Sequence, residues 1–260
     1  MDAILKAPEL KIKFPGSELE IQQSADAFKS ISRSGVIDGC IGALDGILIP
    51  CIAPAATQVG KVSGYFSGHY HRMGINVQAC VDANCRFIFL SVAAPGGTND
   101  IAAIWKTGFL NEVEKLPIGK YIAADCAYIV TEHILTPFPN MTRMKSVKKD
   151  AFNYYLSQLC QVVERAFGIM GKRWRILNSP LEVKMSHVGK LILCIGMLHN
   201  FCAEDVNYIT RAYDDVNTDI IQFNPSDITV TSIPGVSMMR DFLVEKIARE
   251  GLVRPSVTTI

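Results

Sequence analysis

Apolar residues recur along this chain with two periods, one typical of strands and one typical of helices. Residues 41–50 form a short apolar run that carries one acidic residue and ends in proline, as expected of a buried strand with a single functional charge. Residues 72–81 and 86–93 are two further β-rich runs, and residues 82–85 between them suit a hairpin turn. These runs predict an antiparallel meander of three strands.

A helix and a fourth strand follow the meander. Residues 98–100 offer N-cap chemistry for a helix that runs to about Phe109, and residues 120–124 form a strand that ends in Asp125. This order matches the RNase H-like arrangement, in which the fourth strand lies parallel to the first through a right-handed crossover. The predicted fold class is α/β and RNase H-like, with a mixed sheet of a three-strand meander plus parallel strands, flanked by helices.

Four other segments have helical character. Residues 17–30 are polar and compatible with a helix, and residues 150–173 carry an apolar stripe at spacings of three and four. Residues 186–204 predict a buried helix, and residues 238–250 predict a final amphipathic helix.

The length of 260 residues predicts one domain with appendages. We expect residues 1–38 to be an N-terminal segment without a complete DNA-binding domain. Residues 39–205 would be the RNase H-like domain, and residues 206–260 a C-terminal linker and helix. Hydrophobic residues make up 49% and charged residues 20% of the chain, which is typical of a globular protein and not of a disordered one.

Charge and hydropathy narrow the possible partners. The net charge is only +1, so the chain is no general nucleic-acid coat, and contacts with DNA must come from local patches. Mean hydropathy is +0.21, yet no apolar run reaches the roughly 18 residues of a membrane span. The eight cysteines include no CxxC pair, and the first residues hold no cleavable apolar core. We expect an intracellular, reducing compartment and no membrane partner.

Three carboxylates stand out against their apolar surroundings. Asp45 interrupts the first strand, Asp125 follows the fourth, and Glu164 lies beside the stripe of the long helix. An acid in an apolar strand is costly unless it is paired or bound to a cation. The predicted topology brings the three together, which favours a catalytic site for Mg²⁺ or Mn²⁺. Two such ions about 4 Å apart support phosphodiester chemistry. The alternative is that each acid caps a helix or pairs with Lys or Arg.

The helix face around Glu164 carries small residues. Its neighbours at −4, +4 and +7 are Cys160, Gly168 and Gly171. Glycine within a helix costs about 1 kcal/mol relative to alanine. This face therefore keeps room either for metal and phosphate or for a packed strand.

Asp100 is a fourth candidate. RNase H-type nucleases commonly place an extra carboxylate on the helix after the third strand, which is where Asp100 falls. With Thr98 and Asn99 it could instead serve only to cap that helix. Both interpretations stay open.

Seven motifs in order resemble the DDE endonuclease domain of PIF/Harbinger-type transposases and their domesticated derivatives. They cover about residues 12–203. The motifs are 42–46 (GALDG), 65–70 (YFSGHY), 76–79 (NVQA), 95–100 (PGGTND), 124–128 (ADCAY), 163–168 (VERAFG) and 198–201 (LHNF).

The resemblance implies a metal-dependent DNA endonuclease that works by a two-metal DDE mechanism in the nucleus. The catalytic and metal-binding triad of the family falls on Asp45, Asp125 and Glu164, with Asp100 as an additional metal-ligand candidate. Such systems also imply a separate DNA-binding partner that supplies sequence specificity.

The chain departs from this family at two places near the acids. Ile47 and Leu48 follow Gly46 where family members often have Thr-His, and Cys160 stands four residues before the glutamate where arginine is usual. We also expect the upstream helix-turn-helix region of the family to be absent, because only about 40 residues precede Asp45. A truncated element copy, an incomplete gene model and a domesticated gene are all consistent with this.

Basic residues flank Glu164 in sequence and are the candidates for contact with DNA phosphates, although both clusters could be merely solvated surface. One cluster precedes the long helix and the other lies along it. They comprise Arg143, Lys145, Lys148 and Lys149, and then Arg165, Lys172, Arg173 and Arg175.

Two functions remain open at this stage, a metal-dependent nuclease and a non-catalytic remnant that binds DNA or protein. A small-molecule enzyme is a distant third, because the chain has no Gly-rich phosphate loop and no Ser-His-Asp motif. His69 and His71 are expected in ordinary loop or strand positions.

Overall fold

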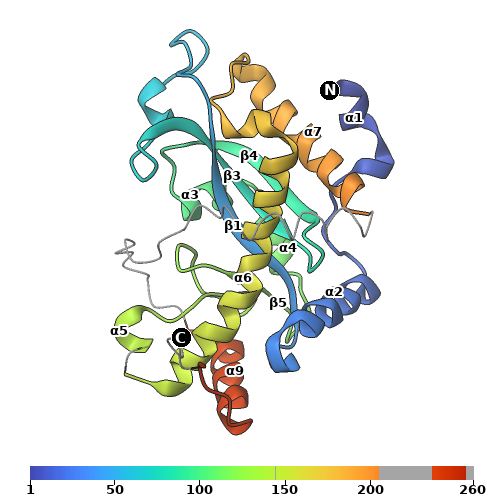
Figure 1. The fold of residues 1–260 in the computed structure, drawn as a ribbon, viewed down its shortest axis with the longest axis vertical. Coiled ribbons are helices and arrows are strands. Elements are labelled where there is room, and N and C mark those ends of the chain that lie inside the picture. Colours follow the sequence, from blue (N-terminus) through green and yellow to red (C-terminus); the bar gives the residue numbers. More distant parts are fainter. Residues whose placement is uncertain (144, 205–235, 256–260) are drawn as a thin grey trace, which may run out of the picture.

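The centre of the molecule is a mixed sheet, seen in the computed structural model of Figure 1. The structure describes residues 1–143, 145–204 and 236–255. The strands are β1 (Cys40–Pro50), β2 (Phe66–Ser67), β3 (Arg72–Val81), β4 (Phe87–Pro95), β5 (Tyr121–Ala124) and β6 (Ile134–Leu135). β3 pairs antiparallel with β1, β2 and β4, whereas β5 lies parallel to β1 and β6 parallel to β5. This sheet and its flanking helices confirm the predicted fold class.

Helices cover both faces of the sheet. In chain order they are α1 (Asp2–Lys6), α2 (Glu18–Ile31), α3 (Asp100–Trp105), α4 (Phe109–Val113), α5 (Asn140–Arg143), α6 (Val147–Arg173), α7 (Met185–Ala203) and α9 (Met238–Arg249). Short 3₁₀ turns occupy Pro8–Leu10, Arg33–Gly35, Val62–Tyr65 and Arg175–Asn178.

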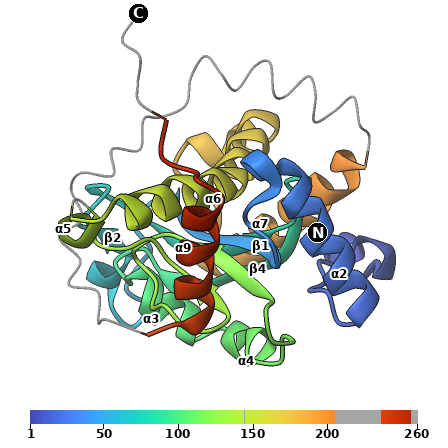
Figure 2. The same cartoon turned by 90° about the horizontal axis from the view of Figure 1, so that it is seen from below.

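Two hydrophobic clusters show which helices face which side. On one face, side chains of α6, α7 and α9 pack with Ala43 of β1 and Val77 of β3. On the other face, side chains of α2, α3 and α4 pack with Leu44 of β1 and Ile122 of β5. Figure 1 shows α6 crossing the sheet, and in Figure 2, seen from below, α9 lies beside α6. The long helix predicted from its apolar stripe is therefore a central packing element.

Local sequence explains the ends of several elements. The predicted turn at 82–85 forms, with the Asp82 carboxylate accepting hydrogen bonds from the backbone N–H groups of Asn84 and Arg86, both at 2.9 Å. Ser17 begins α2 with a capping box, in which its side chain accepts from the Glu20 N–H and the Glu20 carboxylate accepts from the Ser17 N–H. The Ser146 side chain caps α6 by accepting from the Lys149 N–H, so that α6 begins three residues before the predicted Asp150.

The helix predicted to run from Asp100 to about Phe109 is two shorter helices. α3 ends at Trp105 and α4 begins at Phe109. Gly108 between them has a φ of 72°, a left-handed conformation that an α-helix cannot contain. The prediction was wrong because the apolar spacing continues across the break.

The C-terminal predictions are covered only in part. The predicted helix at 238–250 is found as α9, which packs on α6. The predicted linker at 206–235 lies outside the described residues, and the boundaries at 38 and 205 stay predictions. No helix in the described part of the chain is long and apolar enough to span a bilayer.

Candidate functional site

Asp45 and Asp125 lie side by side because their strands are parallel neighbours. The last paired residues of β1 and β5 are Leu44 and Ala124, and each aspartate comes directly after its paired residue. Side chains alternate along a strand. Since Ala43 packs on the α6 face and Leu44 on the opposite one, Asp45 points toward α6. The two carboxylates therefore meet where β5 stops, beneath the long helix.

Local backbone groups hold both carboxylates. One oxygen of Asp45 accepts a hydrogen bond from the Gly46 N–H at 2.7 Å. One oxygen of Asp125 accepts from the Ala127 N–H at 2.9 Å, in the turn that follows β5. Each aspartate is thus oriented by its own strand end.

The pKa values show that the negative charge at this place is uncompensated. Burial raises the pKa of Asp45 well above its usual range, and the nearby carboxylates of Asp125, Asp100 and Glu164 raise it further. Burial, with Asp100 and Glu164, raises the pKa of Asp125 to about 6 despite the hydrogen bond from Ala127. Such a cluster has a strong tendency to bind a proton or a cation.

Glu164 joins this group from α6. Its side chain is exposed at the surface, and partial desolvation raises its pKa. Its carboxylate raises the pKa values of both Asp45 and Asp125. The structure therefore places all three acids predicted to form the triad in one region, with Glu164 on the solvent side.

Small residues on the α6 face have two explanations. Gly171 lies against the Asn178 side chain, which donates to the Gly171 carbonyl at 3.2 Å. Cys160 lies close enough to Asp125, Asp45 and Glu164 that these acids, after burial, raise the pKa of its thiol well above the usual range. The neutral thiol leaves the acids without the cation that arginine would supply there. Gly171 makes room for a local turn, whereas Cys160 borders the acids.

Asp100 approaches the same place from the opposite face of the sheet. Asn99, not Asp100, caps α3, because the Asn99 side chain accepts from the Ala102 N–H. The Asp100 carboxylate turns toward β3 and accepts hydrogen bonds from Gln78 at 2.8 Å and from Asn76 at 3.0 Å. Capping by Asp100 is therefore the wrong alternative.

The donor set suits a hard divalent cation, although no ion-binding geometry is formed. Four carboxylates gather at the end of β5, and such oxygens are the ligands that Mg²⁺ and Mn²⁺ prefer. Among the described residues, no group of three or more His, Cys, Asp or Glu side chains is close enough to hold a metal ion as it stands. The chemistry of the donors fits the implied cation, and binding would require the side chains to converge.

Of the basic residues predicted to precede the long helix, Lys148 and Lys149 lie in its first turn, because α6 begins at Val147, and these two and Arg143 have partners within the protein. Arg143 contacts Asp150 at 3.4 Å, and Lys148 contacts Glu245 of α9 at 2.8 Å. The ammonium of Lys149 lies 4.7 Å from the centre of the Phe138 ring. Lys145 is exposed. In Figures 1 and 2, α5 and α3 lie on the same side of the molecule.

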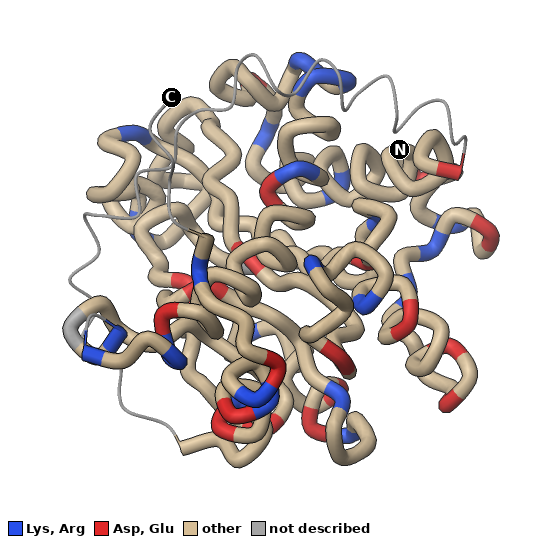
Figure 3. The backbone as a smooth tube through the Cα atoms, turned by 60° about the horizontal axis from the view of Figure 1, so that its bottom comes forward, with Lys and Arg blue, Asp and Glu red and all other residues tan. Residues whose placement is uncertain are grey.

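The second basic cluster is divided by the helix surface. Arg165 is half-buried and interacts with the Cys85 thiol near the β3–β4 turn, which places it away from Glu164. Lys172, Arg173 and Arg175 are exposed at and beyond the end of α6. In the view of Figure 3, basic and acidic segments are interspersed over the molecule. The candidate phosphate contacts are therefore separate points on the surface.

Sequence reasoning missed four residues at the site, one of which is Asn76, the donor to Asp100 described above. Gln78 and Tyr128 form a hydrogen bond of 2.6 Å beside Asp100. Tyr70 follows β2, and its pKa is raised by burial and then by Asp45 and Asp100. All four lie in quoted motifs, so the motifs located them but did not show what they contact. His69 and His71 lie in the exposed turn next to Tyr70, as expected.

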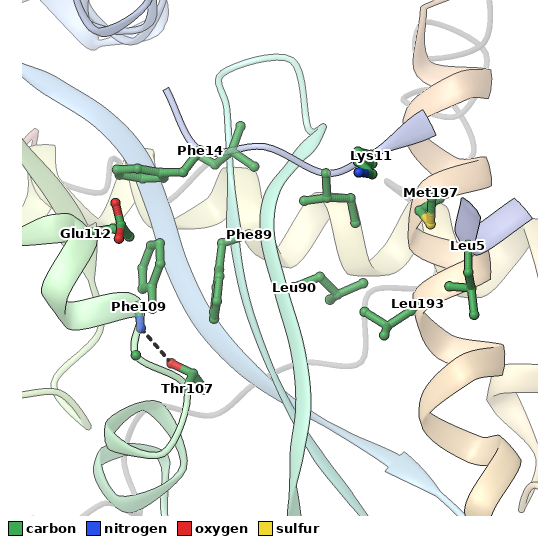
Figure 4. A pocket seen from close by; sticks show the side chains of 13 residues that line it. Leu5, Lys11, Phe14, Phe89, Leu90, Thr107, Phe109, Glu112, Leu193 and Met197 are labelled. Carbon is green, nitrogen blue, oxygen red and sulfur yellow. Dashed lines mark hydrogen bonds between the residues drawn. The ribbon is translucent and has the colours of Figure 1, made fainter. Parts of the chain in front are cut away.

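A surface pocket of about 480 Å³ lies elsewhere (Figure 4). It is bounded by the N-terminal segment, β4, α4 and α7, and its lining is mainly apolar. Phe89 and Phe109 stack there with ring centres 3.9 Å apart, and the Phe14 ring meets Phe109 edge-on at 5.3 Å. None of the four carboxylates lines this pocket.

Known proteins place this arrangement in a family. A curated protein of Arabidopsis thaliana, "Protein ALP1-like", is 26% identical over 196 residues, which are 70% of this chain and 46% of that protein. The chain thus matches less than half the length of that relative. No solved structure gives a significant match. Residues 44–200, more than half of the chain, match the family model described as DDE superfamily endonuclease. The chain therefore belongs to the DDE superfamily endonuclease family.

Proposed function

We propose that this protein is a metal-dependent DNA endonuclease of transposase descent. The observation that carries the proposal is the pairing of Asp45 and Asp125 at the end of β5, where burial and neighbouring carboxylates raise both pKa values and no basic partner among the described residues offsets them. A structural ion pair would lower those pKa values. An acidic pair of this kind is suited to hold a divalent cation.

In this proposal Asp45, Asp125 and Glu164 hold Mg²⁺ or Mn²⁺. When bound, a pair of such ions would activate a water or 3′-hydroxyl and stabilise the leaving oxygen of the phosphodiester. Asp45 and Asp125, held by the Gly46 and Ala127 backbone N–H groups, form the inner, half-buried side of the site. Glu164 forms the exposed side, where a phosphate from solvent can reach it.

DNA would be held by sequence-independent phosphate contacts. The candidates are Lys145, Lys148 and Lys149 near the start of α6, with Arg143, and Lys172 and Arg173 at its end. The half-buried position of Arg165 beside Cys85 makes it the weakest candidate. Such contacts position a duplex without reading its sequence. A separate DNA-binding partner would supply specificity, and the expected location is the nucleus.

A catalytically inactive remnant is the second candidate. Cys160 borders the acids where the resembled family usually has arginine, and its neutral thiol cannot offset their charge. Such a protein would keep the fold and bind DNA or another protein without cutting.

Nicking of supercoiled plasmid by the purified chain tests the proposal. We expect nicking that requires Mg²⁺ or Mn²⁺ and disappears in Asp45→Asn, which removes a charge but keeps the shape of the side chain. Lys29→Ala, which breaks an exposed ion pair with Asp38, serves as the matched control and should nick normally. Absence of nicking, together with no rise in melting temperature on adding metal, would favour the remnant.

A further inference from the structure

Three side chains outside the proposed triad form a hydrogen-bonded frame around Asp100. The Tyr128 hydroxyl donates to the Gln78 side-chain oxygen at 2.6 Å. The Gln78 amide nitrogen donates to Asp100 and to the Asn76 side-chain oxygen, both at 2.8 Å. The Asn76 amide nitrogen donates to the same Asp100 oxygen and to the Thr98 carbonyl, both at 3.0 Å. Two amides and one hydroxyl thus act together on one carboxylate.

Every N–H and O–H group on the side chains of the frame donates a hydrogen bond. Gln78 is 1% exposed, Tyr128 3% and Asn76 8%, and a buried polar group that lacks a partner costs about 1–3 kcal/mol. All four amide N–H groups are used, and two of them end on one oxygen of Asp100. Because Tyr128 occupies the oxygen of Gln78, the amide presents its nitrogen to Asp100. Tyr128 therefore sets the orientation of Gln78, and Gln78 that of Asp100.

The first strand leaves space for Asp100 beside Asp45. A methyl group at Gly46 would collide with the Asp100 carboxylate and with the amide of Gln78. β5 has ended at Ala124, so carboxylates from both faces can meet around this open edge of β1. Within the described residues, the second oxygen of Asp100 receives no hydrogen bond from the frame. An oriented carboxylate with one available oxygen thus lies next to Asp45.

We propose that Tyr128, Gln78 and Asn76 are positioning residues that hold Asp100 as a fourth carboxylate of the metal site. They act through Asp100 and touch neither metal nor substrate. The inference rests on the proposed function, because it requires the cation that the acids would bind.

The test is Mn²⁺ binding to the full chain, measured from the electron paramagnetic resonance signal of the free ion. Gln78→Met keeps the side-chain length but removes both polar atoms, and Tyr128→Phe removes only the hydroxyl. Loss of such outer partners typically weakens metal binding about 10–100-fold. We expect at least a tenfold loss for Gln78→Met and a smaller loss for Tyr128→Phe. In an Asp100→Asn background neither change should weaken binding further, because both act through Asp100.

A control variant separates this role from lost stability. Asn200 makes two backbone hydrogen bonds of 2.7 Å to Phe87, which lies near the other end of β3. Asn200→Ala should lower the melting temperature and leave Mn²⁺ affinity unchanged. The proposal would be wrong if Gln78→Met weakened Mn²⁺ binding equally with and without Asp100. It would also be wrong if Asp100→Asn bound Mn²⁺ with wild-type affinity.

The outcomes also distinguish a failure of the proposed role of the frame from a failure of the proposed nuclease function. A wild-type chain that binds and cleaves, with unchanged affinity in all frame variants, rejects the frame alone. Mn²⁺ binding with the expected coupling but without cleavage supports the frame and rejects the nuclease. A wild-type chain that neither binds Mn²⁺ nor cleaves rejects both.

Discussion

At the scale of single residues, the site combines acids that disfavour one another's ionisation. The unfolded chain separates Asp45 from Asp125 by 80 positions, but the parallel pairing of β1 and β5 makes them neighbours. In the absence of metal, folding therefore brings like charges together at neutral pH. A bound cation would reverse the sign of that contribution.

The variant Asp125→Asn tests how much stability the metal-free protein loses by bringing these acids together, because that loss depends on pH. The pKa of Asp125 is about 6 in the folded protein, against an ordinary value of 3.8. Between these values the folded state binds more protons than the unfolded state, so the metal-free wild type loses stability as pH rises through this window. The variant lacks this loss. Its advantage over wild type should be larger at pH 7 than at pH 4, by on the order of 2 kcal/mol.

Urea unfolding in the presence of a chelator, at both pH values, measures that difference. Adding Mg²⁺ at pH 7 should stabilise only the wild type. An advantage that is equal at the two pH values would show that the Asp125 carboxylate does not carry this cost of burial and repulsion.

Gly46→Ala tests the close approach of Asp100 to β1. The added methyl group collides with Asp100 and Gln78, so one or both must shift. We expect a loss of about 1–3 kcal/mol in the free energy of unfolding, as for other overpacked sites, and weaker Mn²⁺ binding. A methyl group at Gly60 would meet no atom within 4 Å, so Gly60→Ala is the matched control. Equal behaviour of the two variants would contradict the proposed crowding.

At the scale of elements, α9 and α6 form one packing unit. Leu243 of α9 is fully buried in the cluster that also contains the inner side chains of α6. Leu243→Ala should lower the free energy of unfolding by about 2–5 kcal/mol, because it leaves a cavity. Its neighbour Phe242 is 54% exposed, so Phe242→Ala should change stability little. Chemical denaturation measures both, and a small effect at Leu243 would mean that α9 is only loosely attached.

The start of α6 is the element for which DNA binding can be tested most directly. Lys148 pairs with Glu245 at an exposed position, and such pairs contribute little, so the lysine is available to a phosphate. Changing Lys145, Lys148 and Lys149 together to Ala should weaken binding equally on unrelated duplexes. The slope of log affinity against log salt should become shallower by about one for each lost contact.

A control with the same change in charge removes three lysines from exposed ion pairs elsewhere. Lys29, Lys115 and Lys190 pair with Asp38, Glu112 and Asp2. Their joint replacement by Ala should leave the salt slope closer to wild type. An identical slope in both triple variants would assign binding to general charge, and tight binding to one sequence would contradict the need for a partner.

The period of the apolar residues, together with cap and turn chemistry, was enough to predict most of the longer helices and strands. β3 has the predicted bounds, and the acid within the apolar run of β1 indicated the site before any contact was known. The frame around Asp100 could not be predicted, because Tyr128 and Gln78 are 50 residues apart and neither has a local signal for the other. The break at Gly108 was missed because a glycine within a helical pattern either is tolerated inside the helix or ends it, and the sequence alone does not show which.

At the scale of the whole molecule, the family match and the charge distribution give different information. The match at residues 44–200 covers the acids, α6 and the sheet except the first four residues of β1, but neither α2 nor α9. A net charge of +1 with an acidic centre gives little long-range attraction for a polyanion. Affinity for DNA would therefore depend on a few contacts at set distances from the acids.

Because α6 is one continuous helix, it fixes the distance between the lysines at its start and Glu164. Lys149 and Glu164 lie on this one helix, fifteen residues apart, which at 1.5 Å per residue corresponds to about 22 Å. Along B-DNA this spans roughly six to seven base-pair steps. Duplexes that extend at least that far on one side of the scissile phosphate should gain affinity from the lysines, and shorter ones should not. A length series of duplexes would thus reveal a footprint whose edge is defined by the helix.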